Sequence, residues 1–297
     1  MQNKNQIKQL LASIGASPKK RLGQNFLIDL NLMRLLVDSA NIKKTDVVLE
    51  AGCGTGSLTE EIVERAALCI AVEFDRKLAE TAKRRLTKKE NVEIINADIL
   101  AKKNVKNPLI TDKILAARRR FPCRLLLVAN LPYGVAGPLM CNLITGPVTA
   151  DAMFVTVQKE VAQRMTASPS TEHYGSLSIL MNATGRTKKI RLLKPTVFWP
   201  SPKVDSAMIS FLRDADKVGR IKNMRIFNDC INLFMQHRRK QLKGCVKFAK
   251  GELAKIKNWP VIFEQAAVEP QKRPDQLSAD DYLAIANLCC KLLKQNS

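Results

Sequence analysis

Histidine and acidic side chains are scarce in this sequence. There are two histidines, His173 and His237, which are too few for a histidine-based catalytic triad or a histidine metal cluster. The 297 residues include 27 Asp and Glu against 49 Lys and Arg, so the formal net charge is +22. This excess of positive charge favours a polyanionic partner, which would be either a nucleic acid or an anionic membrane surface.

Long apolar runs are also missing. No stretch is long and apolar enough for a transmembrane helix, and residues 1–17 are too polar for a signal peptide. We therefore expect a nucleic acid rather than a membrane as the partner. We expect residues 1–17 to form a weakly amphipathic, poorly anchored segment.

The cysteines lack the spacing of a metal site. The sequence has eight cysteines but no Cys-x-x-Cys pair, and most of them lie in apolar stretches, where a thiol behaves as a small hydrophobe. We therefore expect reduced thiols, no bound metal ion and a cytoplasmic location.

A βαβ pattern with a glycine turn occupies the first half of the chain. An apolar strand at 47–50 leads into Ala51-Gly52-Cys53-Gly54-Thr55-Gly56, and a helix is predicted over 57–66. Further apolar strands are predicted at 68–72, 92–95 and 125–129. Glycines at such a turn let the backbone approach a ligand at the helix N-terminus.

Acidic residues follow two of these strands directly. Glu73 comes roughly twenty positions after the glycine turn, where a carboxylate can accept both ribose hydroxyls of an adenosine. Asp98 follows the next strand and can accept a hydrogen from an adenine amino group. Many nucleotide-binding enzymes share a glycine turn, but Gly-x-Gly-x-Gly after Glu50 favours S-adenosylmethionine over NAD.

Asn130-Leu131-Pro132-Tyr133 follows the strand at 125–129, at the edge where open α/β sheets bind ligands. The Asn130 amide and the Leu131 carbonyl can accept both hydrogens of an exocyclic amine. Pro132 restricts the backbone, and the Tyr133 ring can stack on the base. The alternative is a strand-ending turn in which Asn and Pro are ordinary turn residues.

Three later segments allow two interpretations each. The aromatic loop 198–206 can place Phe198 opposite Tyr133 as a second wall for a flipped base, or it can be ordinary core packing. The basic stretch 101–122 is either a solvated insertion or an extra contact with RNA. From residue 214 the chain is charged, helical and strand-free, and its Arg238-Arg239-Lys240 suits phosphate binding or a solvated face.

Taken together, the sequence resembles the small-subunit (16S-type) ribosomal RNA adenine N6,N6-dimethyltransferases from Lys20 to about Ala286. The stretches that carry the resemblance are 21–27, 50–56, Glu73, Asp98, 130–133, 158–164, 174–178, 198–206, 238–240 and 273–278. The resemblance implies an α/β fold, with a Rossmann-like class I S-adenosylmethionine-dependent methyltransferase sheet and a small C-terminal all-helical domain. It places a catalytic domain at 1–213 and a basic RNA-binding domain at 214–297.

The resemblance also implies the roles of individual residues. The catalytic residues are Asn130, Leu131, Pro132, Tyr133 and Phe198. Those that bind S-adenosylmethionine are Asn25, Leu27, Gly52, Gly54, Glu73, Phe74, Asp98, Ile99 and Asn130. Those that bind RNA are Lys203, Arg238, Arg239 and Lys240.

The implied reaction is dimethylation at N6 of two adjacent adenines near the 3′ end of small-subunit ribosomal RNA, during ribosome biogenesis. The expected partner is this RNA or a pre-ribosomal particle, and we expect a monomer. The alternatives are a large-subunit adenine N6-methyltransferase of the antibiotic-resistance type and a non-catalytic assembly factor. Two departures from the family are Gly134-Val135-Ala136-Gly137, where an Asn and hydroxyl residues are usual, and the long 101–122 insertion.

Overall fold

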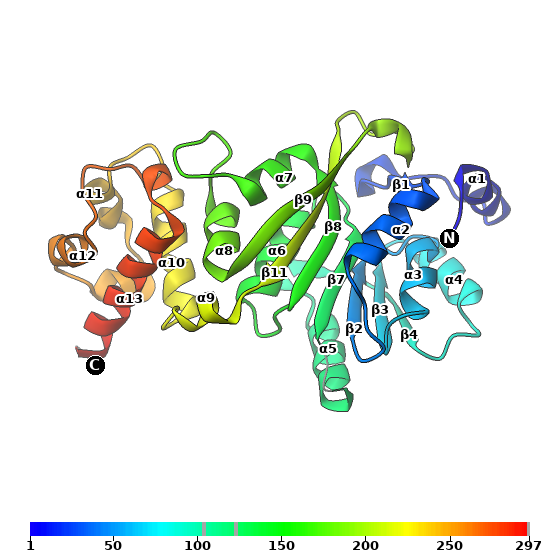
Figure 1. The fold of residues 1–297 in the computed structure, drawn as a ribbon, viewed down its shortest axis with the longest axis horizontal. Helices are drawn as coiled ribbons and strands as arrows, with labels where there is room; N and C mark the ends of the chain where they lie inside the picture. Colours follow the sequence, from blue (N-terminus) through cyan, green and yellow to red (C-terminus); the bar gives the residue numbers. More distant parts are fainter. Residues whose placement is uncertain (103–104, 122–123, 296–297) are drawn as a thin grey trace. The chain divides into compact units, whose positions relative to one another are not determined.

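The chain folds into two compact units, shown in Figure 1. The computed structural model describes residues 1–102, 105–121 and 124–295. Unit 1 contains residues 1–162 and 188–212, and unit 2 contains residues 163–187 and the chain from residue 213 onward. The expected catalytic domain contained all of residues 1–213, whereas residues 163–187 pack with the C-terminal helices in unit 2.

Unit 1 is built on a seven-stranded sheet with the order β4-β3-β2-β7-β8-β11-β9. Its strands are β2 (Val47–Ala51), β3 (Leu68–Glu73), β4 (Val92–Asn96), β7 (Leu125–Asn130), β8 (Ala152–Gln158), β9 (Gly185–Leu193) and β11 (Ser206–Arg213). Neighbouring strands from β4 to β8 are parallel, and β11 is antiparallel to β8. The α/β prediction is confirmed, as are the strands predicted at 68–72, 92–95 and 125–129.

The helices of this part of the chain are α1 (Lys4–Ser13), α2 (Leu30–Ser39), α3 (Ser57–Val63), α4 (Arg76–Arg85), α5 (Pro108–Arg120), α6 (Ala136–Thr145) and α7 (Lys159–Thr166). Two short pairs of strands, β1 (Phe26–Leu27) with β10 (Phe198–Trp199) and β5 (Leu100–Lys102) with β6 (Val105–Lys106), lie outside the main sheet. Helix α3 contacts β3, and α4 contacts β3 and β4, so these helices cover part of the sheet.

The strand order reverses between β2 and β7, and this reversal positions the site. The chain runs outward from β2 to β3 and β4, then returns to β7 on the other side of β2. Strands β2 and β3 are buried along their whole length, as parallel strands covered on both faces must be. The carboxyl ends of β2 and β7 therefore meet at the point where open α/β sheets bind ligands.

The N-terminal segment is anchored, so the prediction of a poorly anchored leader is wrong. Helix α1 begins with a capping box at Asn3, and its Ile7 and Leu11 side chains are only 1% and 2% exposed. They pack with Leu78 of α4. The Gln2 backbone N–H donates to Ser57 Oγ at 2.7 Å, which ties the segment to α3.

The insertion forms the β5–β6 pair and α5, although residues 103–104 and 122–123, with Cys123, lie outside the described residues. Arg118, near the end of α5, donates to the Thr149 carbonyl oxygen at 2.8 Å and lies 3.3 Å from Asp151 Oδ2. The Leu125 N–H donates to the same carboxylate oxygen at 2.7 Å, at the first residue of β7. Arg118 thus holds the amino edge of the sheet, opposite the ligand-binding edge.

Unit 2 is helical. Its helices are α8 (Ser176–Thr184), α9 (Ala215–Gly219), α10 (Met224–Met235), α11 (Leu242–Cys245), α12 (Trp259–Gln265) and α13 (Ala279–Gln295). The Phe234 ring lies 6.0 Å from Trp259 and 6.1 Å from Tyr282 between centroids, in an aromatic core between α10, α12 and α13. Among the described helices, none has the length and apolar character that crossing a membrane requires.

Candidate active site

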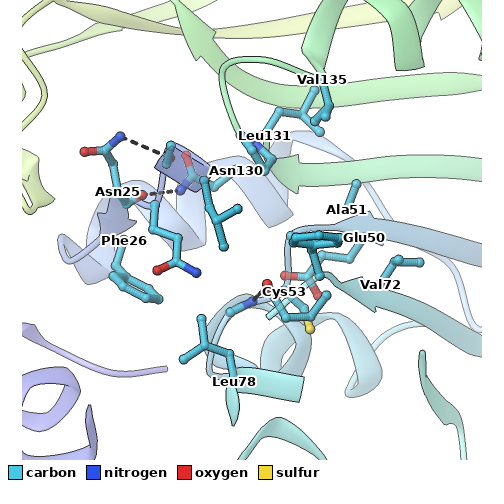
Figure 2. Close-up of a pocket in the computed structure, with 18 of the residues that line it drawn as sticks. Asn25, Phe26, Glu50, Ala51, Cys53, Val72, Leu78, Asn130, Leu131 and Val135 are labelled. Carbon is cyan, nitrogen blue, oxygen red and sulfur yellow. Dashed lines mark hydrogen bonds between the residues drawn. The ribbon is translucent and has the colours of Figure 1, made fainter. Parts of the chain in front are cut away.

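A cavity of about 730 Å³ opens at the carboxyl ends of β2, β3 and β7, entirely within unit 1 (Figure 2). All nine residues predicted to bind S-adenosylmethionine line it, and so do Leu131, Pro132 and Tyr133. The structure therefore brings together almost the whole predicted site. Ile7 of α1 also lines the cavity, which the sequence did not indicate because α1 was expected to be unanchored.

The glycine turn between β2 and α3 packs against the Asn-Leu-Pro-Tyr loop. Gly52 and Gly54 have φ values of +79° and +57°, in the left-handed region that favours glycine. A Cβ atom on Gly52 would lie 3.0 Å from Pro132 Cγ, and one on Gly54 would lie 3.0 Å from the Phe26 ring. Side chains at these two positions would therefore push the walls of the cavity apart.

Glu73 presents its carboxylate from the end of β3. The N–H groups of Gly54 and Asp75 each donate to one of its two oxygens at 2.8 Å. The side chain is 7% exposed, and this burial raises its pKa, although the two backbone donors oppose the shift by favouring the charged form. Each oxygen keeps a second lone pair, so the group can still accept a hydrogen bond from a ligand hydroxyl.

Glu50 also lines the cavity, near the end of β2 and beside β3, and is only 2% exposed. Thr59 Oγ1 donates to Glu50 Oε2 at 2.6 Å. Burial raises the pKa of Glu50 to about 8 because it disfavours the charged form more than the Thr59 hydrogen bond favours it. A buried carboxyl group with a raised pKa at this position is a property that sequence reasoning missed, since glutamate is seldom buried.

Asp98, Ile99 and Phe74 line the cavity just after the ends of β3 and β4. Asp98 is exposed, and its Oδ1 accepts a hydrogen bond from the Leu100 N–H at 2.9 Å. Ile99 is 6% exposed, whereas Phe74 is 57% exposed and presents an apolar ring. Together they form an apolar surface with one carboxylate at its rim, which suits a flat heterocycle carrying an amino group.

Asn130 is held by two hydrogen bonds. Its Nδ2 donates to the Asn25 carbonyl oxygen at 2.8 Å, the dashed line between these residues in Figure 2. Its Oδ1 accepts a short hydrogen bond from Thr156 Oγ1 of β8. The amide oxygen and nitrogen thus have distinct partners, which determines the orientation of the amide.

Thr156 is a site residue that the sequence did not reveal, since it lies within β8 and outside every motif of the sequence. Its side chain is 1% exposed. Its backbone carbonyl also accepts from the Leu131 N–H at 3.1 Å. One residue of β8 therefore contacts both residues that carry the predicted amine acceptors, Asn130 through its side chain and Leu131 through its N–H.

Tyr133 is half-buried at the cavity, and its hydroxyl lies 3.2 Å from Ser206 Oγ at the start of β11. Burial raises the pKa of Tyr133, so the phenol is neutral at physiological pH. The Gly134-Val135-Ala136-Gly137 departure has a local effect: α6 begins at Ala136 after Val135, whose side chain makes no capping hydrogen bond.

Phe198 does not line the cavity, so its expected position opposite Tyr133 is corrected. Strand β10 pairs antiparallel with β1, and Phe198 lies opposite Leu27 in this pair. Its side chain is 3% exposed and belongs to the apolar core of unit 1. Core packing, the alternative interpretation of the aromatic loop, describes Phe198 in this structure.

The residues predicted to bind RNA lie outside the cavity. Lys203 is exposed in the loop before β11 of unit 1. Arg239 and Lys240 are exposed in unit 2, whereas Arg238 Nη2 lies 3.6 Å from Asp275 Oδ2. Among the described residues no cluster of three or more His, Cys, Asp or Glu is arranged to hold a metal ion.

Comparison with known proteins agrees with this architecture. Residues 15–289 match the family model described as ribosomal RNA adenine dimethylase. The chain is 35% identical over 289 residues to the ribosomal RNA small subunit methyltransferase A of Pediococcus pentosaceus, covering 96% of this chain and 94% of that protein. It is 36% identical over 282 residues to the protein of the same name from Pelotomaculum thermopropionicum, covering 95% and 94%.

Two solved structures share the fold. A dimethyladenosine transferase from Plasmodium falciparum has a TM-score of 0.68 and 22% identity, covering 86% of this chain and 94% of that one. The 23S rRNA methyltransferase ErmE has a TM-score of 0.60 and 21% identity, covering 89% and 98%. With a family model that spans most of its length and relatives this similar, the chain belongs to the ribosomal RNA adenine dimethylase family.

Proposed function

We propose that this chain dimethylates the N6 amines of two adjacent adenines near the 3′ end of small-subunit ribosomal RNA, with S-adenosylmethionine as methyl donor. Membership of the family supports the reaction class. The observation that carries the site assignment is the oriented Asn130 amide at the rim of a cavity lined by every predicted donor ligand.

The cavity fits the donor. Glu73 offers carboxylate lone pairs to ribose hydroxyls, and Asp98 with Phe74 and Ile99 suits the adenine. The glycine turn leaves the space that a Cβ atom on Gly52 or Gly54 would fill. Bound S-adenosylmethionine would supply an electrophilic methyl carbon, and its demethylated product would be a neutral thioether.

The acceptor amine needs help from the protein, because its lone pair is delocalised into the adenine ring. Asn130 Oδ1 and the Leu131 carbonyl accept its two hydrogens and draw the nitrogen towards tetrahedral geometry, which frees the lone pair to form the N–C bond. The proton leaves through these acceptors to water. Catalysis is then mainly alignment for in-line attack.

The target base must leave its stack to reach Asn130, at a cost of a few kcal/mol. Stacking on Tyr133 offsets roughly 1–3 kcal/mol of this. The Ser206 contact holds the phenol hydroxyl while the ring face stays available. After one transfer a single N–H remains, so the second methylation needs only one acceptor.

Outside the cavity, we propose that Lys203, Arg238, Arg239 and Lys240 contact RNA phosphates, with unit 2 as the main RNA-binding part. The net charge of +22 supports this assignment, because phosphate contacts supply most of the affinity of such proteins. We further propose that the protein acts as a monomer in the cytoplasm and uses no metal ion.

The test is methyl transfer from labelled S-adenosylmethionine to small-subunit particles that lack adenine dimethylation, with large-subunit particles in parallel. We expect label in small-subunit RNA, recovered as N6,N6-dimethyladenosine. Label in the large subunit would favour the resistance-type alternative, and donor binding without transfer would favour an assembly factor. Asn130→Ala should lose turnover, and near-normal turnover with donor and RNA still bound would refute the mechanism.

A further inference from the structure

Unit 2 contains a basic stretch with no acidic residue. Residues 236–250 include six cationic side chains and no Asp or Glu: Arg238, Arg239, Lys240, Lys243, Lys247 and Lys250. Arg238 pairs with Asp275, but no ion pair is found for the other five among the residues that the structure describes. The surface formed by these side chains therefore carries positive charge that the protein itself does not neutralise.

A pair of stacked aromatic rings, one of them exposed, lies within this stretch. The rings of His237 and Phe248 stack with their centroids 4.0 Å apart and an interplanar angle of 24°. Lys240 Nζ lies 5.7 Å from the centroid of the Phe248 ring. Phe248 is 42% exposed, and the other exposed phenylalanine of the described chain, Phe74, lines the active-site cavity. Phe248 belongs to unit 2 and does not line that cavity, so the proposed reaction does not account for its exposure.

The backbone holds this pair in place. The Lys240 N–H donates to the His237 carbonyl at 2.8 Å, which closes a turn after α10. Leu242 and Cys245 of α11 are fully buried and anchor the segment between the two rings. Phe248 then ends a short 3₁₀ turn, Val246–Phe248. An aromatic pair on an anchored backbone is preformed, so little ordering is needed when a ligand binds.

Cations around an aromatic face suit one class of ligand in particular. Unpaired nucleotides present both a phosphate and a free base face, and proteins bind them with Lys or Arg beside stacking aromatic rings. Bases inside a duplex have no free face. An acidic peptide or an anionic lipid surface would use the charge but would not need the stacked rings.

We infer that His237 and Phe248 form a stacking platform for an unpaired nucleobase in a loop of the bound RNA. This inference rests on the proposed binding of RNA by unit 2 and adds that the unit distinguishes a loop from a duplex. The surrounding lysines and Arg239 hold the phosphates on either side of the stacked base.

The experiment measures the affinity of the full-length protein for two RNAs, a hairpin with 2-aminopurine in its loop and a blunt duplex of the same stem. Phe248→Leu keeps an apolar side chain but removes the ring, and Phe248→Tyr keeps the ring. Arg239→Ala is the control for loss of a positive charge. Leu109→Ala is the control for loss of an exposed apolar side chain, since Leu109 of unit 1 is 48% exposed.

We expect Phe248→Leu to weaken hairpin binding at least about fivefold, the lower end of what base stacking contributes, and to leave duplex binding unchanged. Phe248→Tyr and Leu109→Ala should bind both RNAs with wild-type affinity. Arg239→Ala should bind both RNAs more weakly. Unchanged hairpin binding by Phe248→Leu, or an equal loss for both RNAs, overturns the platform. Unchanged binding of both RNAs by Arg239→Ala overturns the proposed phosphate contact instead.

Discussion

Thr156→Val is the sharpest test of how the amine acceptor is positioned. The substitution removes the hydroxyl that donates to Asn130 Oδ1 and replaces it with a methyl group of similar shape, at a residue that is 1% exposed. The hydrogen bond from the Leu131 N–H to Thr156 uses the backbone carbonyl and therefore remains. Asn130 would keep its Asn25 contact but lose one of the two partners that orient its amide.

The expected loss follows from the free energy of one hydrogen bond between neutral groups, about 0.5–1.5 kcal/mol net. If this free energy is expressed in the transition state, the methyl-transfer rate falls by roughly 2- to 12-fold. The assay is single-turnover transfer at saturating donor and RNA, with donor affinity measured separately by calorimetry. The rate should fall while the separately measured affinity for the donor stays constant.

Thr156→Ser is the matched control, since it keeps the hydroxyl and should restore the rate to within about twofold of wild type. A merely structural role for Thr156 would lower the unfolding midpoint of the Val variant without changing the saturated rate. A wild-type rate in Thr156→Val, or an equal loss in Thr156→Ser, would show that the hydroxyl does not position Asn130.

Two further predictions concern the walls of the cavity. The folded-state pKa of Glu50, about 8, lies above its ordinary value of 4.5, so the folded protein binds more protons between these values and its free energy of unfolding falls as pH rises through them. Glu50→Gln should remove this fall, whose slope is on the order of 1.4 kcal/mol per pH unit. The measurement is the free energy of unfolding in urea between pH 5 and 8, and the same dependence on pH in the variant and the wild type would contradict the burial argument. Gly52→Ala should lower stability by about 1–2 kcal/mol through its left-handed φ, and should weaken donor binding by displacing Pro132. Gly134→Ala is its control, because a Cβ atom there meets nothing within 4 Å, and equal effects of the two changes would refute the steric account.

The aromatic loop shows where sequence reasoning reached its limit. Phe198 was expected at the base-binding wall, but the two ends of the loop have different environments. Ser206 contacts the Tyr133 hydroxyl at 3.2 Å, whereas Phe198 faces the core opposite Leu27. The loop thus contacts the site through the Ser206 hydroxyl and not through the Phe198 ring, on which the sequence prediction was based.

The sequence by itself determined the sheet and the edge at which the site lies. Apolar runs identified the strands, and parallel strands place their carboxyl ends at one edge, so Glu73, Asp98 and Asn130 had to converge there. These conclusions depend on local patterns of a few residues each, which a single sequence displays directly.

Only the tertiary structure decided the partners of those residues. Thr156 is 26 residues from Asn130 in the chain and Ser206 is 73 from Tyr133, and no local pattern connects such pairs. The anchoring of α1, the burial of Glu50 and the inward position of Phe198 likewise depend on which distant segments cover them. Burial and hydrogen-bond pairing are properties of the packed chain, and for this reason the sequence identified the chemistry of the site but not the contacts that hold it.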